Sequence, residues 1–280
     1  MTSAALRSFS NTLYRKNNLF PFLLLTPPLL WFGVIYIGSL SALLWQIFYT
    51  FDDFSIAVTH DLTFDNYSLL FDSTNLDIIL RTLIMAVAVT LACACIGFPI
   101  AYYMTHYGSA REKGFFHVAV MLPMWASYIV KTYAWTVILS QQGILYWVFN
   151  RLGLIGAINA VLQLPIIGGN TLATSNLGRI IVFTYIWLPF MILPIQAALE
   201  RVPTNLLEAS IDLGAKPAQT FRKVLLPLVF SGVVAGSIFT FSLTLSDYII
   251  SQLIGPSGLH IGTMAYTMQG PINNMPSHYR

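Results

Sequence analysis

The feature that most constrains this chain is a series of apolar runs, each long enough to cross a lipid bilayer. A spanning helix needs about 20 mostly apolar residues. Only 9% of the 280 residues are charged and 56% are hydrophobic, whereas soluble domains carry about 25% charged residues. The composition therefore excludes an ordinary water-soluble protein and predicts an all-α, polytopic membrane protein whose solvent is the lipid bilayer. We expect five spans, at residues 19–48, 78–103, 115–139, 178–199 and 224–254.

The segments between these runs predict a single membrane domain over residues 1–280. Segment 140–177 is apolar but is interrupted by Arg151, Asn159 and several glycines, which predicts short helices at the outer surface and not another span. One more crossing there would also move the polar segment 203–223 to the opposite side of the membrane. We therefore expect 203–223 to be an inner loop, and the outer loops to be 49–77, 140–177 and 255–280.

The distribution of charge predicts the orientation, because loops on the cytoplasmic side carry an excess of Lys and Arg. The first outer loop contains six aspartates and no Lys or Arg. Arg81 and Arg179 fall at outer ends of spans, where we expect them to snorkel to the interface. The N-terminus is therefore predicted to be cytoplasmic. The expected inner segments contain Arg7, Arg15, Lys16, Arg111, Lys113, Arg201, Lys216, Arg222 and Lys223.

Motifs of a catalytic or cofactor site are missing from the sequence. The chain contains no Gly-Lys pair, which excludes the phosphate-binding loop that ends in Gly-Lys-Ser/Thr. The five histidines are scattered, and Cys93 and Cys95 point apart on a helix, so neither a metal site nor a disulfide is expected. There is also no basic cluster of the kind that nucleic-acid binding requires. We predict a non-catalytic subunit without a cofactor of its own.

The inner loop has the pattern of two short helices joined by a glycine corner. Pro203 stands where a first-turn proline is tolerated, and Pro217 can open a second helix. Gly214 accepts the left-handed conformation that ends a helix. Glu208 and Asp212 lie on one side of the first helix, and apolar residues at helical spacing lie on the other. This arrangement predicts a compact, projecting knob; the alternative is an ordinary amphipathic loop.

The stretch Glu208–Pro227 resembles the E-A-A-x3-G-x9-I-x-L-P motif of permease subunits of binding-protein-dependent ABC importers. The chain as a whole is similar to a type I importer permease of MetI-like fold. The resemblance implies that the knob docks on a separate ATPase subunit and that a sixth span follows Arg280, so that the chain is truncated. Residues Glu208, Ala209, Gly214, Leu226 and Pro227 match the motif, and Ser210 and Val224 depart from it conservatively.

A second resemblance concerns the outer end of the fifth span. The stretch Phe239–Pro256 is similar to a stretch of spermidine/putrescine permease subunits, in which Ser246 replaces the first acid of a pair and Asp247 keeps the second. A carboxylate there is costly unless it faces water, a cation or a partner. The alternative is that Asp247 pairs with a donor within the protein, such as Lys131 or a tyrosine.

The resemblance to these permeases extends to the aromatic residues that follow Leu122-Pro123. Aromatic rings can hold an ammonium group by cation–π contact. The alternative for these rings is an interfacial aromatic belt. Lys131 would repel a polyamine, which counts against that solute. The candidate residues of the solute path are Trp125, Tyr128, Ser246, Asp247 and Tyr248.

The resemblance implies a permease subunit that forms a solute path across the inner membrane of a bacterium, for a polyamine such as putrescine or spermidine. It implies four partners: a second homologous permease subunit, an ATPase dimer that binds the ATP, a periplasmic solute-binding protein and the lipid bilayer. Two alternatives remain open. One is the same importer class with another small solute (amino-acid-like, a metal or an anion). The other is a self-contained secondary carrier.

Overall fold

The computed structural model describes residues 19–46, 48–52, 57–62, 64, 71–164, 167–256, 258 and 260–269. It divides into two compact units, Met1–Leu76 and Asp77–Arg280, and each is described by itself below. The basic residues expected before the first span, two of the six loop aspartates (Asp53 and Asp65) and the tail beyond Gln269 lie outside the described residues.

The first unit contains one long apolar helix. It consists of α2 (Leu19–Trp31), a π-helical stretch η1 (Phe32–Ile37) and α3 (Gly38–Gln46). Leu24–Trp45 is long and apolar enough to span a membrane, and no part of its apolar window is buried within the chain. A helix that is apolar on all sides and unburied is stable only where lipid or another protein surrounds it.

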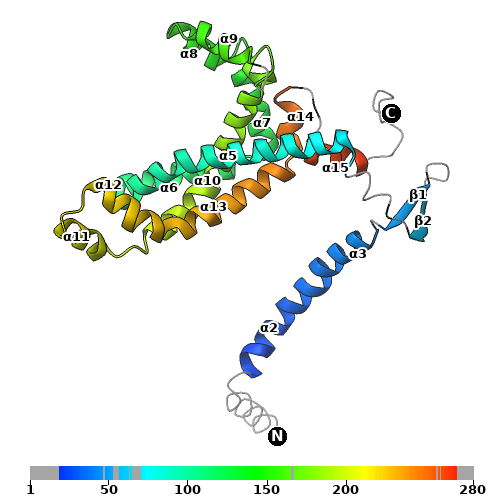
Figure 1. Ribbon diagram of the computed structural model, residues 1–280, viewed down its shortest axis with the longest axis horizontal. Helices are drawn as coiled ribbons and strands as arrows, with labels where there is room; N and C mark the ends of the chain where they lie inside the picture. The colour runs from blue at the N-terminus through cyan, green and yellow to red at the C-terminus, as the bar shows by residue number, and fades with distance from the viewer. Residues whose placement is uncertain are drawn as a thin grey trace. The chain divides into compact units, whose positions relative to one another are not determined.

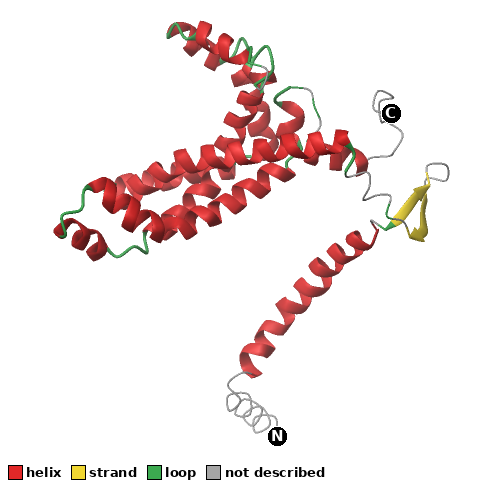
Figure 2. Ribbon diagram, in the orientation of Figure 1, coloured by secondary structure: helices red, strands yellow, loops and turns green. Residues whose placement is uncertain are grey.

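A short hairpin follows this helix. Strands β1 (Tyr49–Asp52) and β2 (Ala57–Leu62) pair antiparallel, with Phe51 opposite Val58. Composition did not predict this hairpin, since the loop is acidic and short of alternating apolar residues. Elsewhere the described chain is helical (Figure 2), which agrees with the predicted fold class.

From Ser73 onward the chain is a set of helices, in which α10 and α13 lie side by side (Figure 1). Three described helices of this part, together with Leu24–Trp45 of the first unit, are long and apolar enough to span a membrane, which makes four, or up to five if one bent pair is counted as a span. The elements are α5 (Ser73–His106), α6 (Ala110–Trp125), α7 (Tyr128–Leu139), α8 (Ile144–Arg151), α9 (Ile155–Leu162), η2 (Leu172–Thr174), α10 (Asn176–Leu199), α11 (Thr204–Asp212), α12 (Pro217–Thr220), η3 (Phe221–Leu225), α13 (Leu226–Ser246), α14 (Ile249–Leu253) and α15 (Ile261–Gln269).

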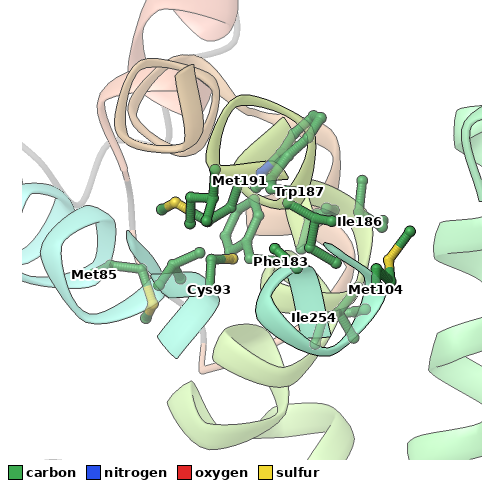
Figure 3. Close-up of a cluster of buried hydrophobic side chains, with 14 of the residues drawn as sticks. Met85, Cys93, Met104, Phe183, Ile186, Trp187, Met191 and Ile254 are labelled. Carbon is green, nitrogen blue, oxygen red and sulfur yellow. The ribbon is translucent and has the colours of Figure 1, made fainter. Parts of the chain in front are cut away.

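The core forms where α5 and α13 pack against α10 (Figure 3). Phe183 and Met191 of α10 are almost fully buried, and so is Cys93 of α5. The Sγ atom of Cys93 lies 3.7 Å from the carbonyl oxygen of Thr184. Cys93 and Cys95 are both free thiols. Cys93 is therefore a small packing residue of the core.

Small residues let α13 approach α10 closely. A Cβ atom built at Gly232 would lie 2.5 Å from the Cβ of Ala198, and one built at Gly236 would lie 2.8 Å from the Sδ of Met191. Gly-x-x-x-Gly spacing of this kind lets helix backbones meet in membranes. The same face continues with Thr240, whose hydroxyl donates to the carbonyl oxygen of Gly236. The predictions made from the sequence do not include this pattern, although its spacing is visible there.

The third span is not the continuous helix over 115–139 that the sequence predicted. Helix α6 and the segment Tyr128–Arg151 meet at a bend of 99°. Ala126 is extended, with φ −76° and ψ 145°. The break frees carbonyl groups at the end of α6, and the Nζ atom of Lys131 donates to one of them, the carbonyl of Pro123, at 2.6 Å. Lys131 therefore satisfies a carbonyl group at the end of α6. Hydropathy alone cannot reveal such an interruption of a helix.

The fifth span also ends earlier than the predicted 224–254. The helical run is Pro217–Ser246, and Asp247 is extended with φ −73° and ψ 130°. The Oδ1 atom of Asp247 accepts from the amide of Ile250 at 2.8 Å. An aspartate that bonds to nearby backbone amides starts a new turn in place of continuing the helix. In segment 140–177 the structure contains the short helices α8, α9 and η2, and their position at the outer surface remains a prediction.

Candidate functional site

The first candidate site is the knob formed by α11, its glycine corner and α12. Pro203 is the N-cap of α11, and Pro217 opens α12. Figure 1 shows α11 and α12 at the opposite end of this unit from α14 and α15. The predicted helix–corner–helix pattern is therefore the local structure, and its docking role stays a prediction.

The corner is a Schellman motif centred on Gly214, whose φ is +81°. The amide of Gly214 donates to the carbonyl oxygen of Ile211 at 2.8 Å, and the amide of Ala215 donates to that of Ser210 at 3.1 Å. These two bonds satisfy carbonyl groups that the end of α11 would otherwise leave open. Glycine is favoured here because the left-handed region costs other residues about 1–2 kcal/mol.

Side chains fix the two short helices to each other. The hydroxyls of Ser210 and Thr220 lie 2.9 Å apart, so one donates to the other. At the start of α12, the amide of Lys216 donates to the Oε1 atom of Gln219 at 2.9 Å. Ser210 is a departure from the family motif, and in this chain it gains a contact that alanine could not make.

The knob presents apolar side chains that nothing in the described chain covers. Leu213 is 88% exposed and Ile211 is 63% exposed. Of the motif residues, Glu208 and Ala209 are also exposed on α11, whereas Leu207 packs against the core cluster. One side of the knob is therefore anchored to the helices and the other is free for a partner.

The junction between the knob and α13 is a π-helical stretch, η3, followed by the motif residues Leu226 and Pro227. The amide of Leu226 donates to the carbonyl oxygen of Phe221, five residues earlier. In a regular α-helix the ring of Pro227 would clash with the carbonyl of Lys223, so the wider turn accommodates the proline. The Phe221 ring meets Phe98 of α5 edge-on at 5.5 Å between centroids.

The second candidate site is built around Asp247, at the break between α13 and α14. Its carboxylate is half-buried and accepts two hydrogen bonds, from the Ile250 amide and from the hydroxyl of Tyr128. Tyr128 is the first residue of α7, immediately after the other break. Two interrupted helices therefore bring together a carboxylate and a phenol that are far apart in sequence. This pairing corresponds to the alternative expected from the sequence, in which Asp247 bonds to a tyrosine.

Tyr128 lies at the centre of an aromatic and cationic cluster. Its ring stacks on Trp187 of α10 at 5.8 Å between centroids. The Nζ atom of Lys131 lies over the same ring, 5.9 Å from its centroid. The indole Nε1 of Trp187 is buried and has no hydrogen-bond partner among the described residues. Trp187 was not among the predicted site residues, because an indole within an apolar span gives no separate signal.

The other predicted path residues are less closely assembled. Tyr248 stacks on Tyr266 of α15 at 4.6 Å. The Trp125 side chain is 81% exposed at the end of α6, and the Ser246 hydroxyl donates back to the carbonyl of Ser242 in its own helix. An open groove beside Tyr248 is lined by Ile129, Tyr133, Tyr248, Ile249, Gln252 and Leu253.

Arg179 is not the snorkelling residue that the sequence predicted. Its side chain is fully buried, and its guanidinium bonds to carbonyl groups in and after α14 and to His260. Snorkelling requires a free path to the interface, whereas here the residues after α14 fold over the arginine. Arg81 does lie at the surface, where it forms an ion pair with Asp77 at 2.7 Å.

Metal binding has no support in the described ranges, since no three His, Cys, Asp or Glu side chains meet there.

Comparison with known proteins identifies the class of this chain. The family described as "Binding-protein-dependent transport system inner membrane component" matches residues 2–278. The chain belongs to this family, and it is a non-catalytic, multi-pass permease subunit of an ABC importer. The family in general works with an ATPase and a binding protein. The resemblance inferred from Glu208–Pro227 is thereby confirmed.

Two relatives show how the chain is placed within the family. It is 62% identical, over 91% of its own length and 82% of the relative's, to the inner membrane ABC transporter permease protein YdcU of Escherichia coli (strain K12). It is 30% identical, over 74% of its own length and 71% of the relative's, to the spermidine/putrescine transport system permease protein PotB of the same organism. The predicted similarity to spermidine/putrescine permeases agrees with the second relative.

Proposed function

We propose that this chain forms part of the path by which an ABC importer carries a polyamine, such as putrescine or spermidine, across the inner membrane. The observation that carries the proposal is the Asp247 carboxylate, held half-buried at the break between two helices and next to the Tyr128 ring. A carboxylate and an aromatic face together suit an ammonium group. The PotB relative, named for spermidine and putrescine transport, supports this choice of solute.

In this proposal, the energy for transport comes from an ATPase dimer that binds the knob around Gly214 from the cytoplasmic side. The exposed Ile211 and Leu213 side chains give that partner an apolar surface to bury. The N-terminus is then cytoplasmic, and a periplasmic binding protein delivers solute at the opposite end. A second, homologous permease subunit completes the path. The ATP binds to the partner, and this chain holds no cofactor.

A second candidate solute is amino-acid-like, and Lys131 favours it. Lys131 lies over the Tyr128 ring, and the hydroxyl of the same tyrosine bonds to the Asp247 carboxylate. An ammonium near Asp247 and a carboxylate near Lys131 would satisfy both charges, whereas a polyamine would meet repulsion from the lysine.

The test uses the complete importer in proteoliposomes with its binding protein and ATP. We expect Asp247→Asn to reduce labelled putrescine uptake about 10- to 100-fold, the range for one lost charge-assisted contact of 1.5–3 kcal/mol. Basal ATPase activity should not change, because the knob is untouched. Asp77→Asn is the matched control, since Asp77 is an exposed acid outside this cluster.

Three outcomes discriminate the alternatives. An unchanged uptake rate in Asp247→Asn removes this residue from the path. Uptake of a labelled ω-amino acid in preference to putrescine, lost in Lys131→Met, selects the amino-acid-like solute. Uptake by this chain without an ATPase, driven by an ion gradient, selects a self-contained carrier.

A further inference from the structure

Arg179 makes the densest set of side-chain hydrogen bonds in the described chain, and the proposed function does not use it. Its Nε donates to the carbonyl of Ile254 at 2.7 Å, and its Nη2 donates to those of Ser251 and Pro256, both at 3.2 Å. Its Nη1 lies 2.7 Å from the Nε2 of His260 and also bonds to the Oδ1 of Asn176 at 3.4 Å. A guanidinium has five N–H groups, and each has an acceptor here.

The acceptors are all neutral. Within the described ranges no carboxylate lies at ion-pair distance from Arg179. His260 must be neutral to accept a hydrogen bond from a cation, and burial, followed by the charge of Arg179, lowers the pKa of His260 to about 4. A buried charge without a counter-ion is stable only if polar groups surround it. The carbonyl groups after α14 are therefore ordered by the arginine, and the arginine depends on them.

The backbone around Arg179 is shaped to the guanidinium. Gly255 has φ +104°, and a Cβ atom built there would lie 2.5 Å from the Cζ of Arg179. The next turn is tied to α5, because the amide of Ile261 donates to the Oγ1 of Thr82 at 3.2 Å. The arginine is thus enclosed by α10, the end of α14 and the start of α15.

We call Arg179 and the groups that bond to it the arginine cage. This cage holds one end of α14, and Asp247 holds the other. The Asp247 carboxylate accepts from the amide of Ile250 at the start of α14, and Arg179 binds the carbonyls of Ser251 and Ile254 at its end. The two charges match the polarity of a helix, with the anion at its N-terminus and the cation at its C-terminus. Displacing the C-terminal end would also displace the turn that fixes the Asp247 carboxylate.

We propose that Arg179 is a positioning residue that fixes the α13–α14 break through α14 and so sets the place of Asp247 against Tyr128. Arg179 does not touch the solute, because its side chain is fully buried and lines no part of the groove beside Tyr248. The consequence for solute affinity rests on the proposed function of Asp247, whereas the consequence for the place of α14 does not.

The experiment measures both consequences in the assembled importer. Cysteines replace Tyr133 of α7 and Gln252 of α14, which line the same groove, in a chain whose two native cysteines are changed to alanine. A short bismaleimide then reports how α14 lies against α7. Uptake kinetics and basal ATPase activity are measured in parallel, without the introduced cysteines.

We expect Arg179→Met to lower the cross-linking yield several-fold and to raise the KM for uptake about tenfold, which corresponds to about 1.4 kcal/mol, with basal ATPase activity unchanged. Arg179→Lys, with three donors in place of five, should restore part of both. Gly255→Ala disturbs the same cage without removing the charge, which covers the case in which Arg179→Met fails to assemble. Arg81→Met, at an exposed arginine, is the matched control.

Unchanged cross-linking in both Arg179→Met and Gly255→Ala overturns the inference, whatever happens to uptake. Reduced cross-linking supports it. Reduced cross-linking with uptake unaffected in these variants and in Asp247→Asn upholds the positioning of α14 and refutes the proposed solute site. The two failures are therefore distinguishable.

Discussion

Substitutions at Gly214 test the coupling assignment most directly. The residue has φ +81°, and a Cβ atom built on it meets no other atom within 4 Å. An alanine therefore fits the space, and its cost within this chain comes from the backbone alone. For alanine that cost is about 1–2 kcal/mol. Asparagine and aspartate occupy the left-handed region more readily than other non-glycine residues.

The expected order of transport rates follows from these costs. Gly214→Asn should retain most activity, and Gly214→Ala should lose about fivefold or more, since 1 kcal/mol changes a population about fivefold. Gly214→Asp should abolish transport while the protein still inserts in the membrane, because it adds a charge where the partner must dock. Asparagine is the matched control for aspartate, with a similar size and backbone preference but no charge.

The assay is ATP-dependent uptake in vesicles, with the amount of inserted protein and the co-purification of the ATPase measured for each variant. Normal uptake by Gly214→Asp would contradict the docking role. If the asparagine variant loses as much activity as the aspartate variant, the defect lies in the corner itself and the charge argument is wrong.

Three further changes test the fold around the sites. Gly232→Ala should lower the thermal stability of the complex, because the added Cβ would lie 2.5 Å from a carbon of α10. The control Gly114→Ala should not lower it, because there is open space around Gly114. Equal stabilities of the two variants would refute the close packing. Phe221→Ala should leave ATPase activity in place but reduce its coupling to uptake, because it removes the edge-on contact with Phe98; unchanged transport per ATP would count against this. The free energy of unfolding should fall by up to about 3 kcal/mol as the pH drops from about 6.5 towards 4, because the folded state lowers the pKa of His260 and disfavours its protonation. His260→Gln should remove this pH dependence. If the variant keeps it, His260 is not its cause.

Much of the local structure follows from the sequence alone. Apolar runs predicted α10 closely, since about 20 apolar residues are needed to cross a bilayer, and they located α5, which extends beyond the predicted span at both ends. The corner at Gly214 followed from residue chemistry, because glycine and the flanking prolines permit few other backbones. Family membership followed from the same segment.

The breaks at Ala126 and Asp247 could not be read from hydropathy. Both stretches are apolar enough to continue a helix. The interruptions are accompanied by one contact with a distant partner, the Tyr128–Asp247 bond, and one local contact across the bend, the Lys131–Pro123 bond. The prediction that Arg179 snorkels to the interface was wrong because it, too, depends on contacts that hydropathy does not reveal. Its five acceptors come mainly from residues about 75 positions later, so only the fold distinguishes a buried arginine from an interfacial one.

The two candidate sites lie at opposite ends of one helix, an arrangement that suits the proposed conversion of a partner's motion into a change of solute access. Helix α13 runs from η3, next to the knob, to Asp247, about 30 Å at 1.5 Å per residue. It packs closely against α10 at Gly232 and Gly236, and close packing opposes independent bending of the two helices. In the proposed function, a rotation or shift imposed near Phe221 is carried along this helix to its other end. There the helix stops, and among the described residues the bond from Tyr128 is the only one that joins the Asp247 carboxylate to another side chain. In the proposed function, that bond is the contact that must change when the path switches its facing, which is why uptake and ATPase coupling should separate in Asp247→Asn and fail together in Gly214→Asp.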